Sequence, residues 1–222
     1  MVALQARAFA QAGFGVLQID LYGCGDSSGD FAQARWDIWL GDLARAWQWL
    51  EQRHTAPSHL WGLRLGALLA LEFARQVRPQ GLILWHPTIS GRAHLNQFAR
   101  LQSAARMFTS APAAEQNTEI AGYRMSSSLA DTIGQLDAAS LTPRCPVQWL
   151  ELNAPPQDAA AEYARAAGQS DAILQPASAL VIDCWREDGA QVHAQAVHGE
   201  PFWLTPEASI STALLAATRM ES

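Results

Sequence analysis

Residues 58–66 read SHLWGLRLG, and this short stretch decides the fold. Its first half has the composition of a buried strand, and the very apolar segment from residue 64 to about residue 77 has that of a helix. The junction between them carries the pattern Gly-x-Arg-x-Gly, with Arg64 at the centre. We expect both glycines to be needed because a β-carbon would collide at a sharp strand-to-helix turn. The central side chain should then project above the edge of a sheet.

This is the shape of a nucleophile elbow, with arginine at the position of the usual serine. Arginine has five donors, no acceptor and a permanent charge, so it cannot attack a carbonyl as a serine oxygen does. The sequence therefore argues against serine-type catalysis. Three roles stay open for Arg64: an ion pair with Asp20, Asp26 or Glu151, an anion site beside a helix N-terminus, or electrostatic stabilisation of a reaction. Since the helix dipole disfavours a cation there, we expect a negative group nearby.

Apolar runs and their spacing predict an alternation of strands and helices along the chain. Strands are expected at 15–20, 58–63, 82–85 and 146–152, and a hairpin at 179–197, in which residues 186–189 form the turn. Helices are expected at 2–12, 33–53, 64–77, 155–167 and 206–218. Residues 90–140 show helical periodicity and no convincing strand, which indicates a helical cap inserted over the sheet.

This alternation predicts an α/β fold with a mostly parallel sheet and helices on both faces. Ligands of such folds bind at the carboxyl ends of the strands, and polar residues of this chain collect there. The candidate site residues at this edge are Asp20, Cys24, Asp26, Ser27, Arg64, His86, Glu151 and His198.

Each candidate has a chemical and a structural interpretation. His198 is a candidate base or a hydrogen-bonded turn residue, and Glu151 competes with Asp158 and Asp183 as the acid. The backbone N–H of Leu65 is the expected oxyanion donor. Cys24 is either a substitute nucleophile or a small residue in a tight loop. His86 is expected to form hydrogen bonds at a strand end.

Composition narrows the class of protein. The chain has 222 residues, of which 49% are hydrophobic, so we expect one domain over residues 1–222 with a cap at about 90–140. A net charge of −6 argues against nucleic acid or an anionic membrane surface as the main partner. The three cysteines are far apart and have no histidine at ligand spacing, so neither a metal nor another cofactor is expected. Apolar runs are too short to span a bilayer, which favours a cytoplasmic protein.

Four stretches carry a resemblance to a known family: QIDLYGCGDSSGDF (18–31), LWGLRLGA (60–67), AGY (121–123) and GEPFW (199–203). The loop at 20–29, the elbow and His198 resemble the α/β-hydrolase superfamily. The full set looks like exosortase A system-associated hydrolase 2. This resemblance implies a hydrolase of ester or thioester bonds from bacterial loci for exopolysaccharide biosynthesis and PEP-CTERM protein sorting. It also implies proteins of that system as partners and an acyl or anionic small molecule as ligand.

The resemblance carries two further expectations. The superfamily has three strands before the helix with which this chain begins, on the order of 40 residues. We therefore expect Met1 to be an internal start or a fragment boundary, and an N-terminally extended chain to be more stable. Three functions stay open: a hydrolase or acyltransferase with an unconventional nucleophile, a protein that binds an anionic ligand without cleaving it, and a scaffold for protein contacts.

Overall fold

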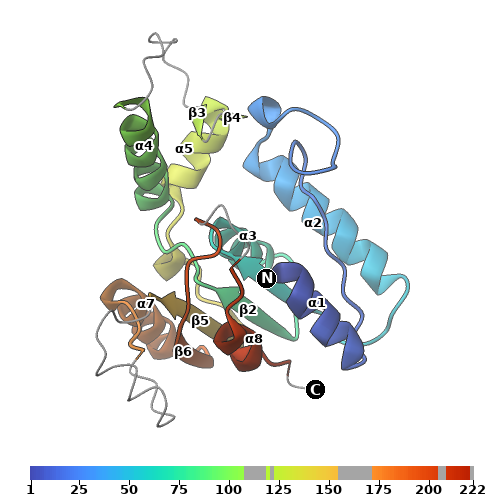
Figure 1. Cartoon of the computed structure of the whole chain (residues 1–222). Coiled ribbons are helices and arrows are strands. Elements are labelled where there is room, and N and C mark those ends of the chain that lie inside the picture. Colours follow the sequence, from blue (N-terminus) through green and yellow to red (C-terminus); the bar gives the residue numbers. More distant parts are fainter. Residues whose placement is uncertain (108–118, 121–122, 155–171, 205–208, 221–222) are drawn as a thin grey trace.

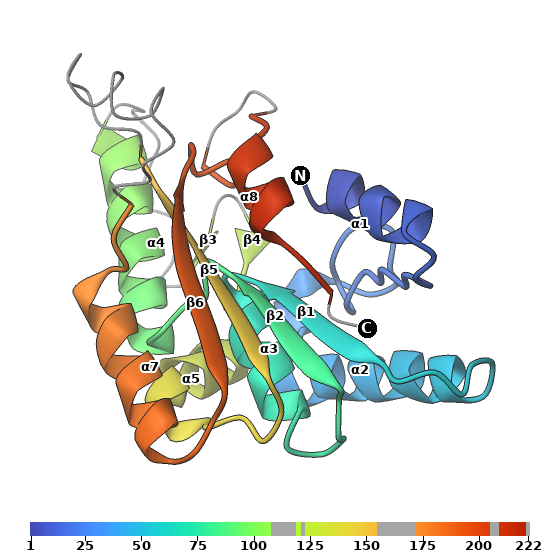
Figure 2. The ribbon, with the colours of Figure 1, turned by 90° about the horizontal axis from the view of Figure 1, so that it is seen from below.

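The computed structural model describes residues 1–107, 119–120, 123–154, 172–204 and 209–220. Its centre is a four-stranded sheet in the order β1-β2-β5-β6, in which all neighbouring strands run parallel. Figure 1 shows the whole chain, and Figure 2 shows the four strands side by side. The strands are β1 (His59–Leu63), β2 (Gly81–Trp85), β5 (Val147–Asn153) and β6 (Val192–His198). The expected parallel sheet is confirmed, and β1, β2 and β5 lie where the sequence predicts them.

Helices cover both faces of this sheet (Figure 2). One face packs against α2 (Trp36–Glu51), α3 (Leu65–Phe73) and α7 (Pro176–Glu187), in a core that contains the fully buried Trp149 and Trp185. The other face packs against α1 (Val2–Gln11) and α8 (Thr212–Ala217), around the buried Trp85. Because β2 has helices on both sides, all five of its residues are buried, which explains its continuous apolar run.

The predicted hairpin at 179–197 is wrong. Residues 176–187 form helix α7, and β6 then pairs parallel to β5. The run looked like a strand because it is apolar, but its buried residues have helical spacing: Ser178, Val181, Ile182 and Trp185. Leu180, which belongs to the same run, is 72% exposed. A short apolar segment cannot be assigned from its hydrophobicity alone.

The predicted buried strand at 15–20 is also wrong. Residues 14–21 form no helix or strand, and Val16 and Leu17 are 39% and 38% exposed. A strand is stable only when a neighbouring strand satisfies its backbone groups, and no described strand pairs with this segment. Residues 15–20 thus have the sequence pattern of a strand but no pairing partner among the described residues.

The predicted cap is largely helical. It contains α4 (Gly91–Met107), α5 (Ser127–Gln135) and the 3₁₀ helix η2 (Ala138–Ser140). A two-residue antiparallel pair, β3 (Glu119–Ile120) with β4 (Tyr123–Arg124), was not expected there. The predicted helix at 155–167 lies outside the described residues, and the one at 206–218 is shorter, since α8 begins at Thr212. In the ranges that the structure describes, no helix has the length and apolar character required for a membrane span.

Candidate functional site

The strand-to-helix turn places Arg64 at the carboxyl edge of the sheet. Arg64 has φ 54° and ψ −119°, a conformation that is costly for a residue with a β-carbon. Two hydrogen bonds hold this turn: Arg64 N donates to Trp85 O (3.0 Å) and Thr88 N donates to Arg64 O (3.1 Å). The predicted turn is therefore present and is fixed by the neighbouring strand.

The two glycines of the turn differ. A β-carbon on Gly62 would lie 2.6 Å from the Ala67 Cα, because the first turn of α3 packs directly over β1. A β-carbon on Gly66 would meet nothing within 4 Å. The expectation that both glycines prevent a collision is confirmed for Gly62 and wrong for Gly66.

The Arg64 side chain is partly buried among neutral groups. Its Nη2 donates to Gln97 Oε1 of α4 (3.3 Å), and its Cζ lies 5.2 Å from the centre of the Trp203 ring. Burial lowers the pKa of this guanidinium, which stays a cation at neutral pH. Within the described ranges no carboxylate comes within ion-pair distance of Arg64, so the expected negative neighbour is not found there.

His86 leaves β2 beside Arg64 and offers a hydrogen-bond donor. Its own φ is 42°, and its ring lies 4.8 Å from the Trp203 ring. Burial and the charge of Arg64 lower the pKa of His86 to about 4, so its ring is neutral at pH 7. Since Leu152 N donates to His86 Nδ1 (3.2 Å), the ring proton is carried by Nε2.

A second neutral histidine comes from the cap. His94 of α4 is 9% exposed, and its Nδ1 lies 3.3 Å from Thr88 Oγ1. Burial and Arg64 lower the pKa of His94 to about 4 as well. The structure therefore places His94 buried near Arg64.

The N-terminus of α3 adds backbone donors to the site. Leu65 is the first residue of this helix, and the first N–H groups of a helix have no acceptor within it. The Arg64 side chain leaves the backbone at this helix N-terminus, where the positive end of the helix dipole disfavours positive charge. A bound anion would be attracted both by the Arg64 guanidinium and by the positive end of the α3 dipole.

Glu151 lies in β5, and its carboxylate accepts hydrogen bonds from groups other than Arg64 and His198. It is 2% exposed and accepts from Gln175 N (2.8 Å), Trp149 Nε1 (3.3 Å) and Ser178 Oγ. Two of these donors belong to the start of α7, so the carboxylate ties β5 to that helix. No hydrogen bond joins Glu151 to Arg64 or His198 within the described residues.

His198 ends β6, opposite Asn153 at the end of β5. Its Nδ1 is buried and has no hydrogen-bond partner among the described groups. The structure thus places His198 at the carboxyl edge, as expected from the sequence. Of the competing acids, Asp158 lies outside the described residues, and Asp183 is on the exposed side of α7.

The loop after residue 20 is bound mainly to itself and to α2. Asp26 N donates to Asp20 Oδ2 (3.0 Å), and Tyr22 N donates to Asp42 Oδ2 of α2 (2.8 Å). Burial and the Asp20 carboxylate raise the pKa of Cys24. Ser27 N donates to Cys24 O (3.0 Å). The structure gives no hydrogen bond or ion pair from any of these residues to Arg64.

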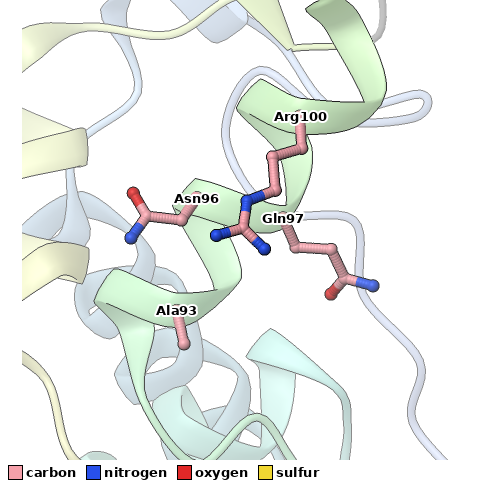
Figure 3. A pocket seen from close by; sticks show the side chains of 4 residues that line it. All are labelled: Ala93, Asn96, Gln97 and Arg100. Carbon is pink, nitrogen blue, oxygen red and sulfur yellow. The ribbon is translucent and has the colours of Figure 1, made fainter. Parts of the chain in front are cut away.

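A cavity of about 400 Å³ adjoins the Arg64 site on α4. The residues that line it are Ala93, Asn96, Gln97 and Arg100. Figure 3 shows the Arg100 side chain extending back along the helix between Asn96 and Gln97, whose side chains point to opposite sides. Gln97 belongs to both the cavity and the Arg64 site.

Gln97 and Trp203 were not singled out as site residues from sequence, although Trp203 lies in the GEPFW stretch. In the described ranges no group of three His, Cys, Asp or Glu residues could hold a metal.

Residues 2–149 match the model of the hydrolase family described as serine aminopeptidase, S33. Among curated proteins, no sequence matches the chain significantly. Similar solved structures include a protein from the pair of metagenome-derived lipolytic enzymes LipS and LipT, with 22% identity and a TM-score of 0.54, over 90% of this chain and 77% of that one. Est1E of Butyrivibrio proteoclasticus, solved with ferulic acid, has 13% identity and a TM-score of 0.58, over 90% and 73%. A Paleococcus ferrophilus monoacylglycerol lipase has 16% identity and a TM-score of 0.53, over 90% and 80%. At these identities the structures show a shared α/β-hydrolase fold.

Proposed function

The chain belongs to the serine aminopeptidase S33 family of hydrolases, and on this premise we propose that its site at Arg64 binds an anionic small molecule. One observation carries the proposal: the partly buried Arg64 cation has neutral neighbours and no carboxylate partner among the described residues. A cation removed from water and left unpaired is unfavourable. A bound carboxylate or phosphate would complete the site.

The neighbouring groups suit the same ligand. The Nε2–H of His86 and the N–H of Leu65 are donors, and a guanidinium binds a carboxylate or a phosphate with two parallel hydrogen bonds. The neutral histidines add no charge that would compete with Arg64. Trp203 and Phe98, whose ring lies 4.7 Å from that of His94, are apolar surfaces for an acyl chain. An acyl carboxylate or acyl phosphate is the chemical class that these groups favour.

We infer that Arg64 stands where the family has its nucleophile. The positive φ and the close packing of Gly62 against α3 support this inference. Two candidate nucleophiles near the elbow are poorly activated: the Thr88 hydroxyl faces His94, whose pKa of about 4 makes it a weak base, and the raised pKa of Cys24 keeps that thiol protonated. We therefore propose that Arg64 binds the ligand. His198 stays the candidate base. Glu151 is a weaker candidate for the acid, because its oxygens already accept hydrogen bonds from the start of α7.

A narrower proposal rests on the four motif stretches described above. We propose that the chain is related to exosortase A system-associated hydrolase 2 and acts on, or binds the product of, an ester or thioester reaction in exopolysaccharide biosynthesis and PEP-CTERM sorting. Its support is the sequence resemblance and the S33 family match. Activity against octanoyl esters and thioesters, compared between the unsubstituted chain, Arg64→Ala and His198→Ala, tests it. Turnover that survives both substitutions would remove these residues from any mechanism.

Calorimetric titration tests the binding proposal directly. The probes are octanoate, octyl phosphate and uncharged octanol. The variants are Arg64→Gln and the control Arg53→Gln, which replaces an exposed arginine that follows α2 and contacts Trp49. Arg64→Gln should weaken octanoate or octyl phosphate at least tenfold and leave octanol unchanged, while Arg53→Gln changes none of them. Equal affinities of the unsubstituted chain and Arg64→Gln for both anions would refute the proposal.

A further inference from the structure

The cap helix α4 is positively charged in a chain that is negative overall. Residues 91–107 contain three arginines and no Asp or Glu, whereas the whole chain has a net charge of −6. Two of these arginines, Arg92 and Arg100, are exposed on the helix. A local concentration of one charge attracts ligands of the opposite charge. Anionic ligands should therefore be drawn to this part of the cap.

One face of α4 brings Arg100 close to the Arg64 site. The cavity of about 400 Å³ lies on this face, and the residues that line it follow one another at helical spacing: Ala93, Asn96, Gln97 and Arg100. The Arg100 side chain runs back along the helix, between Asn96 and Gln97 (Figure 3). Its guanidinium thus points toward the part of α4 that contacts the Arg64 site.

Gln97 connects the two arginines. Its Oε1 accepts a hydrogen bond from Arg64 Nη2 (3.3 Å), and it lines the cavity together with Arg100, three residues further along the helix. Side chains three residues apart on a helix have Cβ atoms roughly 5–6 Å from each other. Two cations therefore lie near one neutral glutamine, and their like charges repel each other.

Arg100 has no anionic partner in the part of the chain that the structure describes. Its guanidinium forms no ion pair or hydrogen bond with the described residues, and the other side chains of the cavity are two amides and a methyl group. The volume of the cavity falls within the range of small-molecule sites, roughly 300–1,000 Å³. An oxyanion in this cavity would find a guanidinium and the amide N–H groups of Asn96 as donors.

We propose that this face of α4 is a second oxyanion subsite, so that the ligand is a dianion with one carboxylate or phosphate at Arg64 and another at Arg100. The inference rests on the proposed binding of an anion at Arg64 and narrows the class of ligand. A dianion neutralises both cations, whereas a monoanion at Arg64 leaves Arg100 without a counterion. Chains with an acid group at each end, or with an acid at one end and a phosphate ester at the other, are the compounds that this arrangement favours.

Calorimetric titration of the whole chain with matched pairs of ligands tests this proposal. Adipate, suberate and sebacate each carry two carboxylates, and their monomethyl esters keep the same carbon chain with only one. A phosphate as the second group is tested with 8-phosphonooxyoctanoate against 8-hydroxyoctanoate. The variants are Arg100→Gln and the control Arg92→Gln, which replaces an exposed arginine of the same helix outside the described lining of the cavity. Arg64→Gln reports on the first subsite.

At least one dianion should bind the unsubstituted chain about three- to fivefold more tightly than its singly charged partner, which is the effect of a partly exposed ion pair. Arg100→Gln should remove this preference and leave the affinity for the singly charged partner unchanged, while Arg92→Gln should keep the preference. No preference for any dianion would overturn the proposal. An equal loss of preference in Arg92→Gln would also overturn it, because it would show a general attraction of anions to α4.

The same titrations separate this inference from the proposed function. If Arg64→Gln weakens the singly charged ligands and no dianion is preferred, the site at Arg64 stands and only the second subsite is refuted. If Arg64→Gln changes no affinity, the proposed function fails. A dianion preference that needs Arg100 but not Arg64 would place an anion site on α4 alone, which would overturn the proposal of two linked subsites.

Discussion

The guanidinium carbon of Arg64 lies 5.2 Å from the centre of the Trp203 ring, and the same ring lies 4.8 Å from that of His86. Arg64 and His86 follow directly on Leu63 and Trp85, which are partners in the register of β1 and β2. Two neighbouring strands therefore deliver a cation and a neutral donor to one edge, and the segment after β6 covers them with an indole. The arrangement fixes the direction of the Arg64 side chain without an anionic partner from the described residues.

Replacing this indole should weaken the proposed anion site without abolishing it. A cation–π contact is worth about 0.5–1 kcal/mol at a partly exposed position, so Trp203→Leu should reduce octanoate affinity about two- to fivefold. Trp49→Leu is the control, because Trp49 of α2 makes the same kind of contact with Arg53, an exposed arginine that follows this helix. Calorimetry on both variants decides the matter, and an unchanged affinity of Trp203→Leu would show that the indole does not orient Arg64.

The two site histidines should make stability depend on pH. The pKa of His86 and that of His94 are both about 4, below the usual value of about 6.5. Between these values the unfolded chain binds more protons than the folded chain, so the free energy of unfolding should fall as the pH drops from 6.5 to 4. Above pH 6.5 the two groups should contribute no slope.

Urea unfolding at several pH values measures this dependence. His94→Gln removes one of the two groups and should reduce the slope between pH 6.5 and 4, whereas His193→Gln, at an exposed position of β6, should leave it unchanged. A slope identical in the unsubstituted chain and His94→Gln would mean that His94 does not titrate at a lowered pKa.

The two glycines of the elbow should respond in opposite ways to alanine. Gly62→Ala forces a β-carbon against the backbone of Ala67 and should destabilise the fold by about 1–3 kcal/mol. Gly66→Ala meets open space within α3 and should stabilise it by about 0.5–1 kcal/mol. Thermal and urea unfolding of the two variants provide the comparison. Equal changes in stability for the two variants would contradict the conclusion that only Gly62 lacks room for a β-carbon.

Local signals explain why the elbow could be predicted and why two other segments could not. The pattern around Arg64 is set by neighbours in sequence, and the structure reproduces its strand, turn and helix. The apolar run in α7 has the same hydrophobicity as a strand and is distinguished only by which of its residues are buried. Residues 15–20 have a strand sequence, but strand formation depends on a partner far away in the chain.

In the candidate site, too, local sequence patterns place some residues, whereas others depend on packing between distant segments. Residues that end or follow strands, such as Arg64, His86 and His198, could be placed at one edge of the sheet because parallel strands end together. Gln97 and His94 come from the cap, whose position over the sheet no local pattern specifies. The hydrogen bonds of Glu151 with Gln175 and Ser178 depend on α7, whose apolar run predicts a strand instead of a helix.

The buried Glu151 carboxylate should be a structural requirement. Glu151→Gln exchanges a charge-assisted acceptor for an amide and puts a donor group opposite Gln175 N or Ser178 Oγ, which should cost about 1–3 kcal/mol of unfolding free energy. Ser178→Ala, which removes one donor, should cost less. Glu187→Gln at the exposed end of α7 is the control. Unfolding free energies within 0.5 kcal/mol, about the effect of a neutral surface substitution, would contradict this role.

The positive φ of His86 gives a last test that separates backbone strain from side-chain chemistry. Asparagine adopts the left-handed region readily and valine does not, so His86→Asn should be more stable than His86→Val by about 1–3 kcal/mol. Both variants lose the imidazole Nε2–H, and both should therefore weaken octanoate binding if this donor contacts the anion. Urea unfolding reports the first effect and calorimetry the second. If the two variants unfold at the same urea concentration, the backbone at residue 86 is free to relax, and the site would not depend on the turn after β2.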